Sequence, residues 1–175
     1  ADAVICDYNY VFDPRVSLKR FFTEKGGDYV FLIDEAHNLV DRAREMYSAE
    51  LYKKPFLEFK REVKTTHSKL SKALNKVNQY MLELKKKCND EGYYIKDELD
   101  NDIYFYLKKF IAECEEYLLK QKKNEINEEH LSLYFEAIAF TRIWELYDDK
   151  YITYTENSSG DVKLKLFCLD PSHLL

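Results

Sequence analysis

Mostly apolar residues recur every seven positions between residues 63 and 88, and this pattern constrains the fold more than any other feature of the chain. Two series, offset from each other by four, make up the pattern: Val63, Leu70, Val77 and Leu84, and His67, Leu74, Met81 and Cys88. Such a heptad seam predicts a long helix that packs one side against other helices. Pro55 lies where this helix can begin, and Gly92 lies where it can end.

Two further amphipathic helices are predicted after the first. Beyond Asp97, apolar residues follow at steps of three and four: Leu99, Ile103, Tyr106, Phe110, Cys114 and Tyr117. Asn127, followed by Glu128 and Glu129, predicts the N-terminus of the third helix, because these residue types favour its positive end. Gly (4) and Pro (3) are scarce, which favours long helices over frequent turns. We therefore expect a long antiparallel helical domain over residues 51–150.

A β-hairpin is predicted within residues 151–175. Tyr151–Thr155 is rich in residues that favour strands, and residues 157–161 have the composition of a turn. In the second strand the apolar residues alternate with other residues: Val162, Leu164, Leu166 and Cys168. This period of two is typical of a strand with one buried face.

Residues 1–50 have the pattern of alternating strand and helix. Ala3–Cys6 is a short apolar strand candidate, and Asp13 with the proline behind it predicts a helix that continues to Phe22. Tyr29–Ile33 is a continuous apolar run, which predicts a central parallel strand buried on both faces. The chain is therefore predicted to be mainly α with an α/β remnant, the remnant being part of a parallel-sheet nucleotide triphosphatase domain.

Asp34-Glu35-Ala36-His37 follows the apolar run directly, and a helix is predicted behind it over Asn38–Met46. At the carboxyl end of a parallel strand, side chains emerge into the crevice where ligands bind. A nucleotide triphosphatase needs one carboxylate there to hold Mg²⁺ and a second to act on the attacking water. Asp34 suits the first role and Glu35 the second, while His37 is placed to respond to the γ-phosphate.

Two other interpretations of this acidic pair compete with the catalytic one. The carboxylates can simply favour the positive end of the following helix. A zinc protease is excluded because the chain has no His-Glu-x-x-His motif. The chain also has no GxxxxGK[ST] phosphate-binding loop, so we expect it to be inactive on its own.

Charge and cysteine usage limit the partners of the chain. A formal net charge of −5 predicts weak or no DNA binding, with the lysine runs acting as solvated helix faces. No pair of the four cysteines has the spacing of a zinc site, and although four cysteines can in principle ligate an iron–sulfur cluster, their wide spacing favours reduced thiols and no bound cofactor. No apolar run approaches the roughly 20 residues that span a membrane, and the first residues do not have the pattern expected of a signal peptide. We expect a cytoplasmic segment cut from a longer chain.

Several segments resemble XPD/DinG-type iron–sulfur helicases of superfamily two. Ala1–Pro14 resembles the segment that follows their iron–sulfur domain, and Tyr29–Leu39 resembles their Walker B motif, including the Asp-Glu-Ala-His box and the asparagine after it. Cys168–Ser172 resembles the point where their chain returns to the first motor domain. The helices in between match the family's arch domain in length and position. The resemblance thus divides the chain into motor (1–50), arch (51–150) and returning hairpin (151–175).

This resemblance implies that the whole protein is an ATP-dependent helicase that moves 5′ to 3′ on single-stranded DNA, in DNA repair. By position, Asp34 would bind Mg²⁺ with ATP, Glu35 would be the catalytic base and His37 would couple hydrolysis to movement. ATP and Mg²⁺ are implied as cofactors, together with a 4Fe-4S cluster upstream of this chain. A bacterial cytoplasm, close to the nucleoid, is the expected location.

A non-enzymatic helical scaffold is the alternative, in which the heptad seam binds a protein partner and the acidic box is a coincidence. An exposed seam would favour the scaffold, whereas a seam buried against the other helices would favour a self-contained arch. Strands in residues 1–50 would also leave unpaired edges through which two copies can form a dimer.

Overall fold

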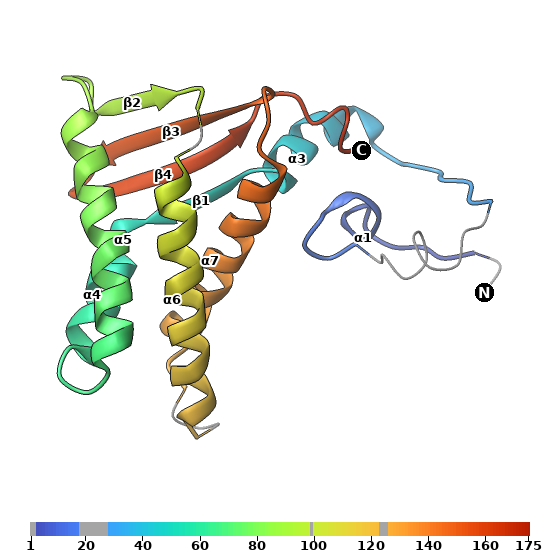
Figure 1. The fold of residues 1–175 in the computed structure, drawn as a ribbon. Coiled ribbons are helices and arrows are strands. Elements are labelled where there is room, and N and C mark those ends of the chain that lie inside the picture. Colours follow the sequence, from blue (N-terminus) through green and yellow to red (C-terminus); the bar gives the residue numbers. More distant parts are fainter. Residues whose placement is uncertain (1–2, 18–27, 99, 123–125) are drawn as a thin grey trace.

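The computed structural model describes residues 3–17, 28–98, 100–122 and 126–175. Its centre is an antiparallel sheet in the order β1-β4-β3-β2, with helices on one face (Figure 1). The strands are β1 (Ala49–Tyr52), β2 (Tyr93–Lys96), β3 (Tyr151–Ser158) and β4 (Asp161–Cys168). Every strand pair is antiparallel.

The predicted C-terminal hairpin is confirmed as β3 and β4, which pair from Tyr151 opposite Cys168 to Ser158 opposite Asp161. The alternating apolar residues of β4 are all buried, as the period of two predicts. Two strands were not predicted from the sequence: β1, which pairs with β4, and β2, which pairs with β3. Each has only four residues, too few for a period to stand out.

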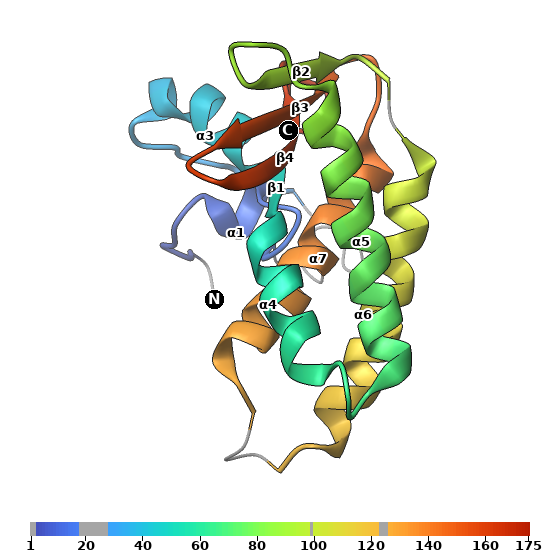
Figure 2. The ribbon, with the colours of Figure 1, turned by 90° about the vertical axis from the view of Figure 1, so that its left-hand side faces the viewer.

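Four helices extend from the sheet and alternate in direction (Figures 1 and 2). They are α4 (Lys53–Val63), α5 (Ser68–Lys87), α6 (Asn101–Lys120) and α7 (Glu128–Leu146). Helix α4 contacts α5, α5 contacts α6, α6 contacts α7, and α7 contacts α4. The predicted antiparallel helical region is therefore confirmed, and none of the described helices has the length and apolar character needed to cross a membrane.

The helix ends follow the local sequence. The side chain of Asn127 accepts a hydrogen bond from the Glu129 amide (2.9 Å), which confirms the predicted start of α7. Asp100 caps α6 in the same way through the Asp102 amide (3.0 Å). This start is later than the predicted one near Asp97, because β2 continues to Lys96 and Asp100 still has an extended backbone (φ −97°, ψ 116°).

The heptad seam lies on two helices, so the prediction of one continuous helix is wrong. Val63 ends α4, and the remaining aliphatic seam residues lie on α5. Thr65 and Thr66 lie in the break, where β-branched side chains weaken helical propensity. The aliphatic seam residues are nevertheless all buried in the core: Val63, Leu70, Leu74, Val77, Met81 and Leu84. The seam is thus covered by the chain's own helices.

The parallel-sheet part of the prediction is wrong for this structure. Ala3–Cys6 and Tyr29–Ile33 are neither strand nor helix, and Val30 and Leu32 are 87% and 94% exposed. A strand needs neighbours for its backbone hydrogen bonds, and all described strands are already ordered in the antiparallel sheet. Of the helix predicted from Asp13 to Phe22, residues 14–16 form a turn instead, and the part from position 18 onward lies outside the described residues.

Gly92 lies close to the backbone of Asn157, and this contact can be tested by substitution. Gly92 has φ +84°, and a Cβ there would lie 3.1 Å from the backbone oxygen of Asn157, whose amide donates to the Gly92 oxygen (2.7 Å). Gly160 has φ +80° but open space around a Cβ. We expect Gly92→Ala to lower the unfolding free energy by more than the about 1–2 kcal/mol of left-handed strain, and Gly160→Ala by that strain alone. Urea unfolding measures both; equal losses would contradict the close contact.

A buried histidine connects α7 to α4. The ring of His130 is stacked on Phe59 with centroids 3.6 Å apart, and its Nε2 lies 3.1 Å from Glu62 Oε2. Burial lowers the pKa of His130 below its usual value and outweighs the opposing attractions of Glu62 and Glu129. The folded state therefore holds this ring neutral.

Stability should consequently fall as the pH decreases from about 7 to about 5. A depressed folded-state pKa contributes stability that is present above the unfolded pKa and is lost as the pH falls through the folded pKa. His130→Phe retains an aromatic ring beside Phe59 but cannot be protonated, so its urea midpoint should fall less over this range. His173→Gln, at a half-exposed histidine, is the matched control and should behave like the wild type. An unchanged pH dependence in His130→Phe would refute this role.

Candidate functional site

The Asp34–His37 box forms an exposed turn immediately before a helix. Asp34 Oδ1 accepts a hydrogen bond from the Glu35 amide (2.9 Å), and the next residues form a short 3-10 helix, η1 (Ala36–Asn38). Glu35 has φ 52° and ψ 36°, in the left-handed region that costs a non-glycine residue about 1–2 kcal/mol. The box therefore has a defined local backbone although it lies outside the sheet.

Glu35 and His37 are brought together, with Glu35 Oε2 3.3 Å from His37 Nε2. Their side chains are 66% and 75% exposed, so this contact adds little to stability and both groups remain accessible. Asp34 is also exposed and is tied to the same turn through its bond to the Glu35 amide. The structure thus places all three predicted site residues within four positions on one surface turn.

The helix behind the box, α3 (Leu39–Met46), confirms the helix predicted over residues 38–46 and fixes the box to the sheet. Ala43 and Met46 are buried, while Arg44 Nε donates to the Leu169 oxygen (3.1 Å). Ser48 Oγ donates to the Arg44 oxygen (2.6 Å) and accepts from the Cys168 amide (3.0 Å). The box is therefore one short helix away from the end of β4.

Tyr47 joins the two ends of the chain beside α3. Its hydroxyl lies 2.8 Å from the Phe12 oxygen and 2.7 Å from the Leu174 oxygen, so its single proton can serve either acceptor. Burial, together with the negative charge of Asp13, raises the pKa of Tyr47 and keeps the proton in place. Phe12 belongs to α1 (Asn9–Phe12). Phe12, in the N-terminal segment that resembles the family, and Leu174, two residues after the C-terminal one, thus both contact Tyr47.

The donor chemistry of the box suits Mg²⁺ but does not complete a site. Two carboxylates are the hard ligands that Mg²⁺ prefers, and this ion usually keeps several waters and phosphate oxygens. Among the described residues no group of three or more possible metal ligands occurs. Asp34 and Glu35 could therefore contribute to a Mg²⁺–nucleotide site without forming a metal centre by themselves.

The cysteines are free thiols with different exposures. Cys6 is exposed, Cys88 is half-buried, and Cys114 and Cys168 are buried. Burial raises the pKa of the Cys114 thiol to about 12, which disfavours the thiolate that an iron–sulfur cluster requires. These residues do not fit an iron–sulfur cluster within the described part of the chain.

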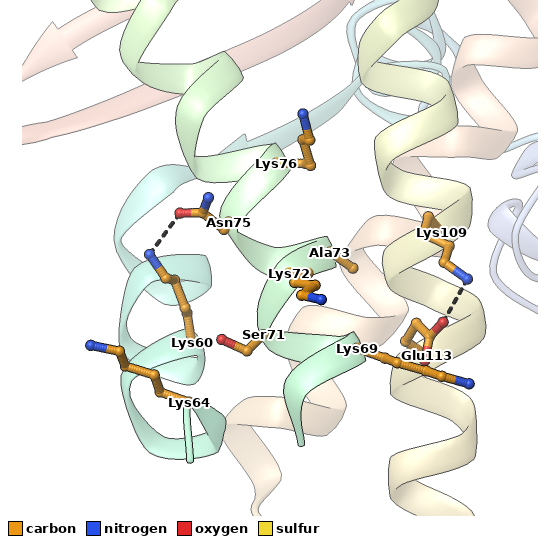
Figure 3. A pocket seen from close by; sticks show the side chains of 10 residues that line it. All are labelled: Lys60, Lys64, Lys69, Ser71, Lys72, Ala73, Asn75, Lys76, Lys109 and Glu113. Carbon is orange, nitrogen blue, oxygen red and sulfur yellow. Dashed lines mark hydrogen bonds and ion pairs between the residues drawn. The ribbon is translucent and has the colours of Figure 1, made fainter. Parts of the chain in front are cut away.

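A second feature was not predicted from the sequence. Lysines of α4, α5 and α6 line a cavity of about 640 Å³ (Figure 3). From the sequence, each lysine run was predicted to be a solvated face of its own helix, because the packing of the helices against one another is not visible in the sequence. The signal was present in the spacing of Lys69, Lys72 and Lys76, which places all three on one side of α5.

Comparison with known proteins supports the N-terminal part of the resemblance. The DEAD_2 family matches residues 1–56, which contain the box. A segment of the chain is 46% identical over 48 residues to the Fanconi anemia group J protein homolog of Gallus gallus. The match covers 27% of this chain and 4% of that protein, and a vertebrate relative gives the predicted bacterial origin no support. Residues 1–56 are therefore similar to the DEAD_2 family, which confirms the resemblance to XPD/DinG-type helicases drawn from these residues.

Proposed function

We propose that this chain is part of an ATP-dependent DNA helicase that moves 5′ to 3′ on single-stranded DNA and acts in DNA repair. The observation that carries the proposal is the Asp34–His37 box inside the DEAD_2 match. The box stands on α3, which is joined to the antiparallel sheet by the hydrogen bonds of Arg44 and Ser48. A movement of the box can therefore shift α3, and through α3 the sheet from which the four helices extend.

Within this proposal the three residues have separate roles. Asp34 would hold the Mg²⁺ that accompanies ATP, and the bound ion would neutralise charge on the phosphates. Glu35 orients the attacking water and accepts its proton. His37, 3.3 Å from Glu35, is placed to respond when that carboxylate changes its charge or position. The phosphate-binding loop is supplied by another part of the whole protein.

The four helices are the proposed arch domain, a clamp and docking surface beside the motor. Their heptad seam is buried against the chain's own helices. A scaffold that binds its partner through this seam would have to open its own core. Seam burial therefore supports the arch over the scaffold, and the domain limits at residues 50 and 150 remain part of the proposal.

An unwinding assay on the whole protein tests the proposed activity and its direction. Duplex DNA with a 5′ single-stranded tail should be separated in the presence of ATP and Mg²⁺, whereas the same duplex with a 3′ tail should remain paired. A blunt duplex is the control for binding without unwinding. Unwinding from the 3′ tail, or none from either tail, would refute the proposed movement.

A further inference from the structure

A basic groove crosses the outer surface of α4, α5 and α6. Six lysines line the cavity of about 640 Å³, with Ser71, Ala73, Asn75 and Glu113 between them. The lysines are Lys60 on α4, Lys64 directly after the end of α4, Lys69, Lys72 and Lys76 on α5, and Lys109 on α6. Figure 3 shows these side chains gathered from three helices over the same surface. We call these six residues the lysine groove.

Most of the positive charge of the groove is not compensated. The carboxylate that lines it, Glu113, is buried and pairs with Lys109 at 2.5 Å. Lys60 donates a hydrogen bond to the neutral side chain of Asn75 (2.6 Å). The remaining four lysines are exposed and make no ion pair with any described residue. A surface that is strongly positive thus occurs on a chain whose net charge is −5.

The lysines of the groove are arranged in rows along the helices. Lys69, Lys72 and Lys76 lie on one side of α5, and at about 1.5 Å per residue they extend over roughly 10 Å. Successive phosphates of one strand in B-form DNA advance by about 3.4 Å along the helix axis and lie farther apart along the backbone itself, so this row is long enough to face more than one phosphate. Lys60 and Lys64 form a second row across the groove, one helical turn apart.

We propose that the lysine groove binds the phosphate backbone of a nucleic-acid strand without reading its bases. No aromatic side chain lines the groove, so bases have no ring on which to stack. All six cations are lysines, which attract phosphates as mobile point charges and impose no fixed geometry on them. The binding site is separate from the Asp34–His37 box and goes beyond the proposed nucleotide chemistry.

Fluorescence anisotropy with a labelled oligothymidine tests the groove directly, using this chain without nucleotide at low salt. The test variant is Lys69→Gln/Lys72→Gln/Lys76→Gln. The control is Lys85→Gln/Lys86→Gln/Lys87→Gln, which removes the same charge from exposed lysines at the end of the same helix. Glutamine retains the helical propensity of lysine, and circular dichroism confirms that both variants remain folded.

The groove variant should bind at least 10-fold more weakly than the wild type, and the control less than about threefold more weakly. The slope of log K against log salt should fall by about 2 in the groove variant, because each lost phosphate contact contributes roughly 0.7. An oligonucleotide without bases should bind as well as oligothymidine. The proposal would be overturned if both variants lost the same affinity for oligothymidine, or if the wild type did not bind it. It would also be overturned if polyglutamate displaced the labelled oligothymidine as well as unlabelled oligothymidine does. Because no ATP is present, these outcomes are independent of whether the box hydrolyses ATP.

Discussion

Replacing Phe110 with alanine is expected to lower the free energy of unfolding of this chain by about 3–5 kcal/mol. Phe110 is fully buried on α6 and contacts two aromatic rings of α4 edge to face. The ring centroids lie 5.3 Å from Phe56 and 6.4 Å from Phe59. Truncation removes this apolar surface and leaves a cavity between two helices that hold the bundle together. Urea unfolding followed by circular dichroism gives the free energy.

Phe105→Ala is the matched control, because it removes the same side chain from the same helix. Phe105 is 65% exposed, so its loss should change the unfolding free energy by less than about 0.5 kcal/mol. A small effect of Phe110→Ala, or similar effects of both variants, would show that α4 and α6 do not share a core in solution.

Replacing Glu35 with glutamine in the whole protein should lower kcat for ATP hydrolysis by about 10²–10⁴-fold, the usual contribution of a general base. Glutamine keeps the size and polarity of the side chain but cannot accept the proton of the attacking water. KM should change little, because Asp34 and the phosphate-binding part of the protein are untouched. Steady-state phosphate release over a range of ATP concentrations separates the two constants.

Glu45→Gln is the control for Glu35→Gln. Glu45 lies on α3, has an exposed side chain and forms only a long surface pair with Arg42 (3.8 Å). Such pairs contribute little, so kcat should stay within about twofold of the wild type. A similar fall in both variants would indicate a general effect of charge near α3, whereas a normal kcat in Glu35→Gln would remove Glu35 from the proposed mechanism.

Local signals predicted those parts of the fold that depend on neighbouring residues. Asn127 predicted a helix start because its side chain bonds an amide two positions away. The hairpin was predicted because its apolar alternation continues through β4, from Val162 to Cys168. In contrast, β1 and β2 are strands because β3 and β4 offer them partners distant in sequence. Such pairing has no signature within four residues.

The same distinction applies to the candidate site. The apolar run Tyr29–Ile33 has the composition of a buried parallel strand, but composition cannot supply the neighbouring strands that burial requires. Asp34, Glu35 and His37 were identified from their order in the chain, and their place on one turn follows from that order. The lysine groove could not be predicted in this way, because Lys60, Lys72 and Lys109 become neighbours only through the packing of three helices.

ATP hydrolysis by the whole protein, measured with and without single-stranded DNA, tests the central claim most directly. The account predicts that DNA stimulates hydrolysis in the wild type and in Glu45→Gln, and that Glu35→Gln shows almost none under either condition. A protein that hydrolyses no ATP, or a Glu35→Gln variant that hydrolyses ATP at the wild-type rate, would contradict the assignment of the Asp34–His37 box to a DNA-dependent motor.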